Sequence, residues 1–293
     1  MSMRKVLLPV LGIVAIGAAS VFFGGCGGGS KEGKAEKKRE ITVISREESS
    51  GTRGAFDELM KITDGKTNEL FREAVIVSST DEVASKVEVD KDAIGYTSLG
   101  SVNSKVKALS IDGVEAKEEN VKNGTYGISR PFVVATRLDA KLPIADDFIK
   151  FVTSKAGQGV VGKAGYITIA GDEAPDYAPA NLSGKLTLSG STSVEKVIET
   201  LKEEYVKLNP NVKIEINYNG SSAGIKDCLS SKSDVAMSSR NLKTEEKEQL
   251  APTTFALDGI AVIVNQENSM TAITSEVVTK IFKGELRYWN DVN

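Results

Sequence analysis

Short apolar runs alternate with segments of helical periodicity from residue 41 to the end of the chain. Short runs rich in Val and Ile are typical of buried strands, whereas apolar residues three or four apart indicate one face of a helix. The pattern predicts strands at 41–45, 74–78, 93–97, 106–111, 132–136, 184–189, 213–217 and 234–238, and a long apolar run at 256–265. It predicts helices after Thr52 and after Thr80, and at 116–122, 144–154, 194–208, 222–229 and 274–282. Alternation of this kind predicts an α/β fold with helices on both faces of its sheets.

The amino-terminal segment follows a different pattern. Basic residues precede an almost wholly apolar stretch at 6–23, which ends in small residues before Cys26. A plain transmembrane anchor is one interpretation, because the stretch is nearly long enough to span a bilayer. The step from small residues to a cysteine favours a bacterial lipoprotein cleavage site instead. We therefore predict a signal peptide at 1–25, lipidation of Cys26, a flexible polar tether at 26–40, and a chain anchored to the extracellular face of the cell membrane.

Composition narrows the classes of function. The 293 residues, 40% of them hydrophobic, suffice for one large or two medium domains. A net charge of −3 disfavours a nucleic-acid-binding protein. The chain has no histidine, the commonest general base and metal ligand, and we expect no catalytic residue, metal or cofactor. With Cys26 lipidated, Cys228 has no cysteine left to pair with, and its helical context predicts a buried thiol.

Polar turns follow several of the predicted strands. Residues 45–54, 188–194 and 218–225 each pass from a strand through hydroxyl residues and glycine into a helix, and 237–240 ends another strand with two serines and an arginine. Such residues cap helices, and the unpaired N–H groups at a helix start attract anions. Each turn alone is equally consistent with an ordinary helix cap. Because the carboxyl ends of strands in an α/β sheet meet at one crevice, we expect the turns to converge on one tetrahedral oxyanion.

Taken together, these motifs resemble the phosphate-binding lipoproteins of bacterial phosphate ABC transporters. The resemblance runs from residue 41 to residue 293, and its motifs are SREESSGTR at 45–53, GSTSV at 190–194, GSSAG at 220–224, MSSR at 237–240 and ALDGIAV at 256–262. It implies a two-lobed α/β fold of the periplasmic-binding-protein type (type II), with the ligand in a cleft between hinged lobes. The implied function is to capture inorganic phosphate and deliver it to the permease subunits of the transporter. The resemblance also implies a monomer that is held to the membrane by its lipid and binds no nucleic acid.

The order of the motifs departs from that family. There the GSTS segment precedes the SGTR segment, whereas here it follows, which predicts a circular permutation with 175–184 joining the family's usual ends. Permutation is tolerated where chain termini lie close together at the surface. The resemblance then implies a split lobe at 41–129 plus 265–293 and a contiguous lobe at 130–264. The chain would cross between them near 129–131 and 264–266.

The resemblance also implies which residues bind the ligand. Residues of one lobe face residues of the other across the cleft, and Glu48 orients Arg46; the implied ligand set is Arg46, Ser50, Gly51, Thr52, Thr192, Ser193, Ser221, Ser239 and Arg240. A surface ion pair is the alternative for Arg240. For Arg53, one position into the helix, a structural role is favoured.

A further departure concerns the choice of ligand. Some relatives carry an aspartate where Ser239 stands, and it accepts the proton of hydrogen phosphate. Sulfate, molybdate or another tetrahedral oxyanion therefore remains an alternative ligand, and Glu48 an alternative acceptor. A sensory or adhesin lipoprotein on the same fold is also open. A hydrolase using Ser50 or Ser191 as nucleophile is disfavoured, because it needs an activating base or metal.

Overall fold

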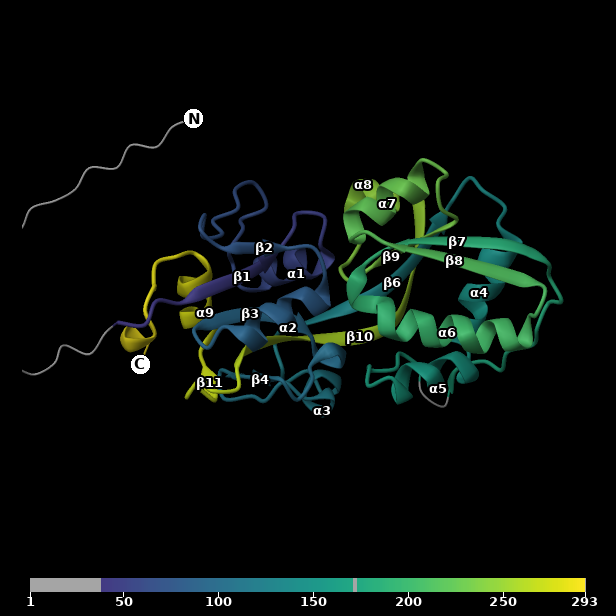
Figure 1. Cartoon of the computed structure of the whole chain (residues 1–293). Helices are drawn as coiled ribbons and strands as arrows, with labels where there is room; N and C mark the ends of the chain where they lie inside the picture. Colours follow the sequence, from purple (N-terminus) through teal and green to yellow (C-terminus); the bar gives the residue numbers. More distant parts are fainter. Residues whose placement is uncertain (1–37, 171–172, 293) are drawn as a thin grey trace, which may run out of the picture. The chain divides into compact units, whose positions relative to one another are not determined.

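The computed structural model describes residues 38–170 and 173–292. The predicted signal peptide, Cys26 and most of the predicted tether lie outside these residues. Among the helices that are described, none is long and apolar enough to cross a lipid bilayer. The described chain is a mixed α/β structure in which a long strand, β10 (Leu250–Asn265), links two groups of strands (Figure 1).

The first part of the chain alternates strands and helices as the sequence pattern predicts. Its elements are β1 (Thr42–Arg46), α1 (Gly51–Leu59), β2 (Val75–Val77), α2 (Thr80–Val89), β3 (Ala93–Ser98), η1 (Leu99–Ser101), β4 (Val106–Ala108), β5 (Ser110–Ile111) and α3 (Glu118–Lys122). After β10, the chain returns to this part with β11 (Ala272–Ile273), α9 (Ser275–Phe282) and η4 (Trp289–Asp291).

The middle of the chain forms the second group of elements. These are β6 (Ser129–Arg137), α4 (Pro143–Thr153), α5 (Lys155–Lys163), β7 (Gly184–Gly190), η3 (Thr192–Val194), α6 (Glu195–Leu208), β8 (Val212–Tyr218), α7 (Ser221–Leu229), β9 (Val235–Ser238) and α8 (Thr244–Lys247). The pattern predicted most of these, but it left α5 unassigned. Glycines at 157, 159 and 162 weaken the helical signal there. Gly157 is required by packing, because a Cβ atom would lie 2.2 Å from the carbonyl oxygen of Phe151.

One continuous sheet joins the two groups, in the strand order β2-β1-β3-β10-β6-β9-β7-β8, with β4 paired to β10. Strands β1, β2 and β3 are parallel, as are β7, β8 and β9. β10 is antiparallel to β3 at one end and to β6 at the other. Within each parallel group the carboxyl ends of the strands therefore lie at the same edge, where turns leading into helices gather.

Separate hydrophobic cores define two lobes. Ile128 and Ile260 pack into the core around α1, α9 and β3, whereas Phe132 and Ala256 pack into the core around α4, α6 and β7. The chain therefore crosses between the lobes at 129–131 and at 257–259. We call 38–128 plus 260–292 the first lobe and 132–256 the second lobe.

The second crossing lies earlier than the sequence analysis placed it. The predicted crossing at 264–266 assigned Val262 and Val264 to the contiguous lobe, but both are buried in the core of the first lobe. Val262 is in register with Tyr96 of β3. The apolar run at 256–265 does not show where one lobe ends, because the single strand β10 belongs to both lobes. Within this run, the polar Asp258 lies next to the point where the pairing of β10 changes from β6 to β3.

A buried ion pair lies where the chain crosses between the lobes. Arg130 on β6 and Asp258 on β10 are paired in register, and Nη2 of Arg130 lies 3.0 Å from Oδ2 of Asp258, with both side chains only 1% exposed. The other carboxylate oxygen, Oδ1, accepts a hydrogen bond of 2.9 Å from Ser98 at the end of β3. Burial raises the pKa of Asp258 and lowers that of Arg130, and their mutual attraction opposes both shifts.

The two described ends of the chain lie together in the first lobe. Lys38 forms an ion pair of 3.1 Å with Asp291, the Arg39 N–H donates to Asn290, and Glu40 forms a β-bridge with Tyr288. Residues 38–40 of the predicted tether are thus part of the folded body. The connector at 175–184 is largely exposed, and Tyr177 attaches it to α4 through a hydrogen bond to Asp147. Cys228 is buried as predicted, and burial raises the pKa of its thiol.

Candidate functional site

The sheet register brings the polar turns of each lobe to one place. In the first lobe, Arg46 at the end of β1 is paired with Val77 at the end of β2. In the second lobe, Gly190 at the end of β7 is paired with both Tyr218 of β8 and Met237 of β9. The turns after these strands meet between the lobes, where their hydroxyl groups bond to one another.

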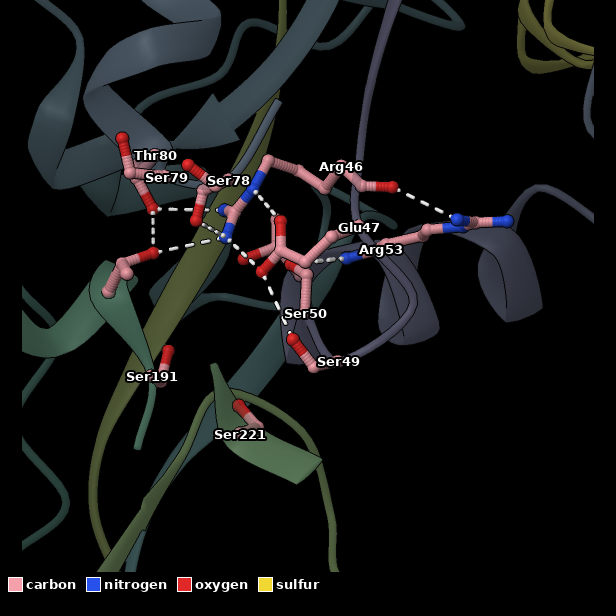
Figure 2. A network of polar contacts seen from close by, with 12 residues as sticks. Arg46, Glu47, Ser49, Ser50, Arg53, Ser78, Ser79, Thr80, Ser191 and Ser221 are labelled. Atoms are coloured by element: carbon pink, nitrogen blue, oxygen red, sulfur yellow. Dashed lines mark hydrogen bonds and ion pairs between the residues drawn. The ribbon is translucent and has the colours of Figure 1, made fainter. Parts of the chain in front are cut away.

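Arg46 is the buried cation of this site. Its side chain is 1% exposed and bonds to both lobes (Figure 2). Within the first lobe, Nη1 donates to Thr80 Oγ1 at 3.3 Å and Nη2 to the carbonyl oxygen of Ser78 at 3.3 Å. Toward the second lobe, Nη2 donates to Thr192 Oγ1 at 3.2 Å. The guanidinium is therefore fixed in position at the junction of the lobes.

Glu47 holds Arg46 in place, and the prediction that Glu48 does so is wrong. Nε and Nη2 of Arg46 donate to the two carboxylate oxygens of Glu47, each at 2.9 Å, whereas Glu48 is exposed. Strand alternation would put Arg46 and Glu48 on one face, but β1 ends at Arg46. The following residues form a turn closed by a hydrogen bond from Ser50 N–H to the Glu47 carbonyl, and alternation no longer applies there.

The start of α1 brings the first lobe into close contact with the second. Ser50 caps the helix by accepting from the Arg53 N–H at 3.2 Å. Gly51 is required by the approach of the lobes, because a Cβ atom there would lie 2.2 Å from Ser221 Oγ. Thr52 shares a hydrogen bond of 2.7 Å with Ser193.

The second lobe contributes serines and a threonine from three turns. Ser191 Oγ donates to Ser239 Oγ at 2.9 Å, and the Ser239 N–H donates to Ser221 Oγ at 3.1 Å. Ser191 also accepts from the Ser193 N–H and so caps η3. Ser221 begins α7, where φ at the preceding Gly220 is +93°, a conformation that favours glycine. These hydroxyl groups are all buried.

Thr80 belongs to the same cluster, although sequence reasoning did not name it. Its hydroxyl lies 3.0 Å from Thr192 Oγ1 and 3.0 Å from Ser193 Oγ. The signal was present, because Ser78, Ser79 and Thr80 lead from β2 into α2 in the same way as the other turns lead into helices.

Two other arginines make different contacts. Arg240 donates from Nη1 and Nη2 to the carboxylate of Glu246, each at 2.8 Å, and to Ser222 at 3.2 Å. Burial of Glu246 raises its pKa, but the hydrogen bonds from Arg240 and from the Lys243 N–H outweigh this and lower the pKa overall. The structure therefore does not bring Arg240 into the hydroxyl cluster, contrary to its predicted role. Arg53 bonds to Asp57 and to the Arg46 carbonyl, which is a structural role.

A cavity of about 550 Å³ lies beside the cluster, with walls from both lobes. Its lining includes Ser50 and Glu58 of the first lobe, Ser129 at the crossing, and Ser222 and Arg240 of the second lobe. Ser50 and Ser222 stand at the starts of α1 and α7, so this cavity lies next to the helix starts that face each other.

The chemistry of the cluster suits a small oxyanion. Four helical segments, α1, α2, η3 and α7, start here, and each start presents N–H groups and the positive end of the local backbone dipoles. Neutral hydroxyls supply directed donors, and Arg46 supplies positive charge that Glu47 partly offsets. The chain contains no histidine that could activate a serine as a nucleophile. The arrangement can therefore bind an anion through many short hydrogen bonds.

Comparisons with known proteins agree with this chemistry. The model of the PBP superfamily domain matches residues 31–156 and 175–293. The phosphate-binding protein PstS 2 of Streptococcus agalactiae is 40% identical over 293 residues, which cover 98% of this chain and 97% of that protein. The phosphate-binding protein PstS 2 of Streptococcus pneumoniae is 42% identical over 287 residues, 97% of this chain and 98% of that protein.

A solved structure is similar as well. The crystal structure of the phosphate-binding protein of a phosphate ABC transporter from Streptococcus pneumoniae superposes with a TM-score of 0.70. It is 43% identical in sequence and covers 87% of this chain and 100% of its own. The two-lobed fold predicted from the motifs is confirmed.

These comparisons do not show a circular permutation. The streptococcal relatives align with this chain over almost their whole length. The paired chain ends and the exposed connector at 175–184 meet the geometric requirement for a permuted chain. Permutation relative to other members of the family stays a prediction.

Proposed function

Since this chain belongs to the PBP superfamily, in the family of bacterial phosphate-binding proteins, we propose that it captures inorganic phosphate outside the cytoplasmic membrane and delivers it to the permease of an ABC transporter. The observation that carries the proposal is the buried cluster around Arg46. There, hydroxyls and helix starts from both lobes converge on a single guanidinium. The protein binds phosphate and performs no chemistry on it.

The cluster would hold the anion by hydrogen bonds from all sides. In the proposed site, Arg46 balances part of the charge, and the remaining donors are hydroxyl or backbone N–H groups of Ser50, Gly51, Thr52, Thr192, Ser193, Ser221 and Ser239. Hydrogen bonds to a charged group contribute about 1.5–3 kcal/mol each, more than those between neutral groups. A desolvated dianion therefore gains most when the donors already point at one place.

Capture would proceed by closure of the lobes about their two crossings. Direct contacts join the lobes around the cluster: the Ser222 N–H donates to the Ser49 carbonyl at 3.0 Å, and Lys196 Nζ donates to the Gly100 carbonyl at 3.1 Å. Among the described residues, the chain passes between the lobes at 129–131 and at 257–259. Ile167 of the second lobe also packs into the core of the first lobe and forms a β-bridge with Leu257. Opening would break the contacts around the cluster and release phosphate to the permease.

The lipid anchor is part of the same proposal. Cleavage before Cys26 and acylation of its thiol would leave the folded body on a polar segment at the extracellular face of the membrane. A single binding body on such a tether can act as a monomer, because the described site is complete within one chain.

Discrimination between oxyanions is expected to be weak. Ser239 is fully buried in the cluster and offers a hydroxyl where some relatives offer a carboxylate. Both carboxylate oxygens of Glu47 are already bonded to Arg46, and Glu48 is exposed. Sulfate is therefore the second candidate ligand, because few groups at the site repel an anion that carries no proton.

Calorimetric titration of the folded domain with phosphate, sulfate and arsenate at several pH values tests the proposal. We expect phosphate to bind in the micromolar range or tighter, about −8 kcal/mol or more favourable. Absence of phosphate binding under all these conditions would refute the proposed function.

A further inference from the structure

Thr80 occupies a position that the predicted ligand set leaves out. It is the first residue of α2, follows the N-cap Ser79, and is 3% exposed. Its hydroxyl contacts Arg46 of its own lobe and both Thr192 and Ser193 of the other lobe. Thr80 thus connects the cation of the site to the turn that begins η3 in the second lobe (Figure 2).

The hydroxyl of Thr80 has no capacity left for a ligand. A threonine hydroxyl donates one hydrogen bond and accepts two. The Nη1–H of Arg46 uses one acceptor site at 3.3 Å, and Thr192 and Ser193 use the remaining acceptor site and the donor, each at 3.0 Å. We infer that Thr80 is a positioning residue that couples the orientation of Arg46 to closure of the lobes, and so sets how long the anion stays bound.

This coupling has a definite physical basis. When the lobes meet, Thr192 and Ser193 must leave water. In the closed cleft Thr80 supplies one partner for each, in addition to the bond of Thr192 to Arg46 and that of Ser193 to Thr52. Without that hydroxyl, Nη1 of Arg46 loses an acceptor, and Thr192 and Ser193 each lose a buried hydrogen bond. Buried polar groups without partners destabilise the state that buries them, which here is the closed state. Loss of the Thr80 hydroxyl should therefore raise the dissociation rate of the anion more than it changes the association rate.

The inference rests on the proposed function, and phosphate binding by wild type is measured first. Dissociation is then followed by chasing radiolabelled phosphate from the wild type, Thr80→Val, Thr80→Ser and Ser79→Ala. Ser79→Ala is the matched control, because Ser79 caps the same helix by accepting from the Glu82 N–H but has no hydrogen bond to Arg46, Thr192 or Ser193 among the described residues. Thr80→Ala replaces Thr80→Val if the latter does not fold.

We expect Thr80→Val to release phosphate at least about tenfold faster than wild type, whereas Thr80→Ser and Ser79→Ala stay within about threefold. The association rate should change little in all four proteins. Equal dissociation from Thr80→Val and wild type would overturn the inference while leaving the proposed function intact. Equal acceleration in Ser79→Ala, or no rescue by serine, would also overturn it, because the effect would then belong to the helix and not to the hydroxyl. A wild type that binds no phosphate refutes the proposed function itself.

Discussion

Replacing Asp258 by asparagine should destabilise the whole folded body, because it leaves Arg130 charged and unpaired where the chain crosses between the lobes. Both side chains are 1% exposed, and Nε and Nη2 of Arg130 donate to Oδ2 of Asp258 at 3.2 and 3.0 Å. Asparagine keeps an oxygen that can accept from Ser98 but removes the negative charge. Removing one partner of a buried pair costs about 3–5 kcal/mol.

The size of that loss makes the prediction measurable by thermal unfolding. For a body of this size, 1 kcal/mol corresponds to about 2–4 °C, so the unfolding midpoint should fall by about 6–20 °C. Glu276→Gln is the control, since it also neutralises one acid of an ion pair, but Glu276 and Lys280 are exposed and its midpoint should not move. Replacing both residues, with Arg130→Met and Asp258→Leu, should restore most of the loss. An Asp258→Asn protein as stable as the control would refute the idea that the pair matters to the fold.

Two further predictions concern the cleft. Gly51→Ala should weaken phosphate binding at least about tenfold in calorimetry with little change in the unfolding midpoint, because the added Cβ would lie 2.2 Å from Ser221 Oγ of the other lobe and so oppose their close approach. Unchanged affinity would mean that binding does not need this close approach. Ser239→Asp should raise the preference for phosphate over sulfate in competition titrations, since a carboxylate repels an anion without a proton at a cost of several kcal/mol. If the wild type rejects sulfate strongly and Glu48→Gln loses this rejection, Glu48 is instead the group that accepts the proton of hydrogen phosphate.

The strands and helices were largely predictable from the sequence, because their signals are local. The turns after β1, β7 and β8 carry hydroxyl residues and glycine at helix starts, and their convergence follows from the α/β pattern. The partner of Arg46 was not predictable, since Glu47 and Glu48 are both carboxylates and the turn geometry decides between them.

Other features depend on contacts that span long stretches of sequence. Thr80 joins the cluster through residues more than a hundred positions away. Its turn leads from β2 into α2 as the other turns lead into helices, but nothing local to it shows that it meets them. Likewise, the change of lobe within β10 depends on which strands pair with it, β6 before Ile260 and β3 after. Helix α5 was missed because its three glycines weaken the helical signal, and only at Gly157 does close packing against α4 account for the glycine.

The central claim is that Arg46 holds an oxyanion at the meeting point of the lobes. Titration calorimetry of Arg46→Ala with phosphate tests it most directly, with Arg137→Ala as a control. Arg137 is a largely buried arginine of the second lobe that bonds to the carbonyls of Cys228 and Ser233. We predict that Arg46→Ala loses at least tenfold in affinity, about 1.4 kcal/mol, while Arg137→Ala binds like the wild type. Unchanged phosphate affinity in a folded Arg46→Ala protein would contradict the site.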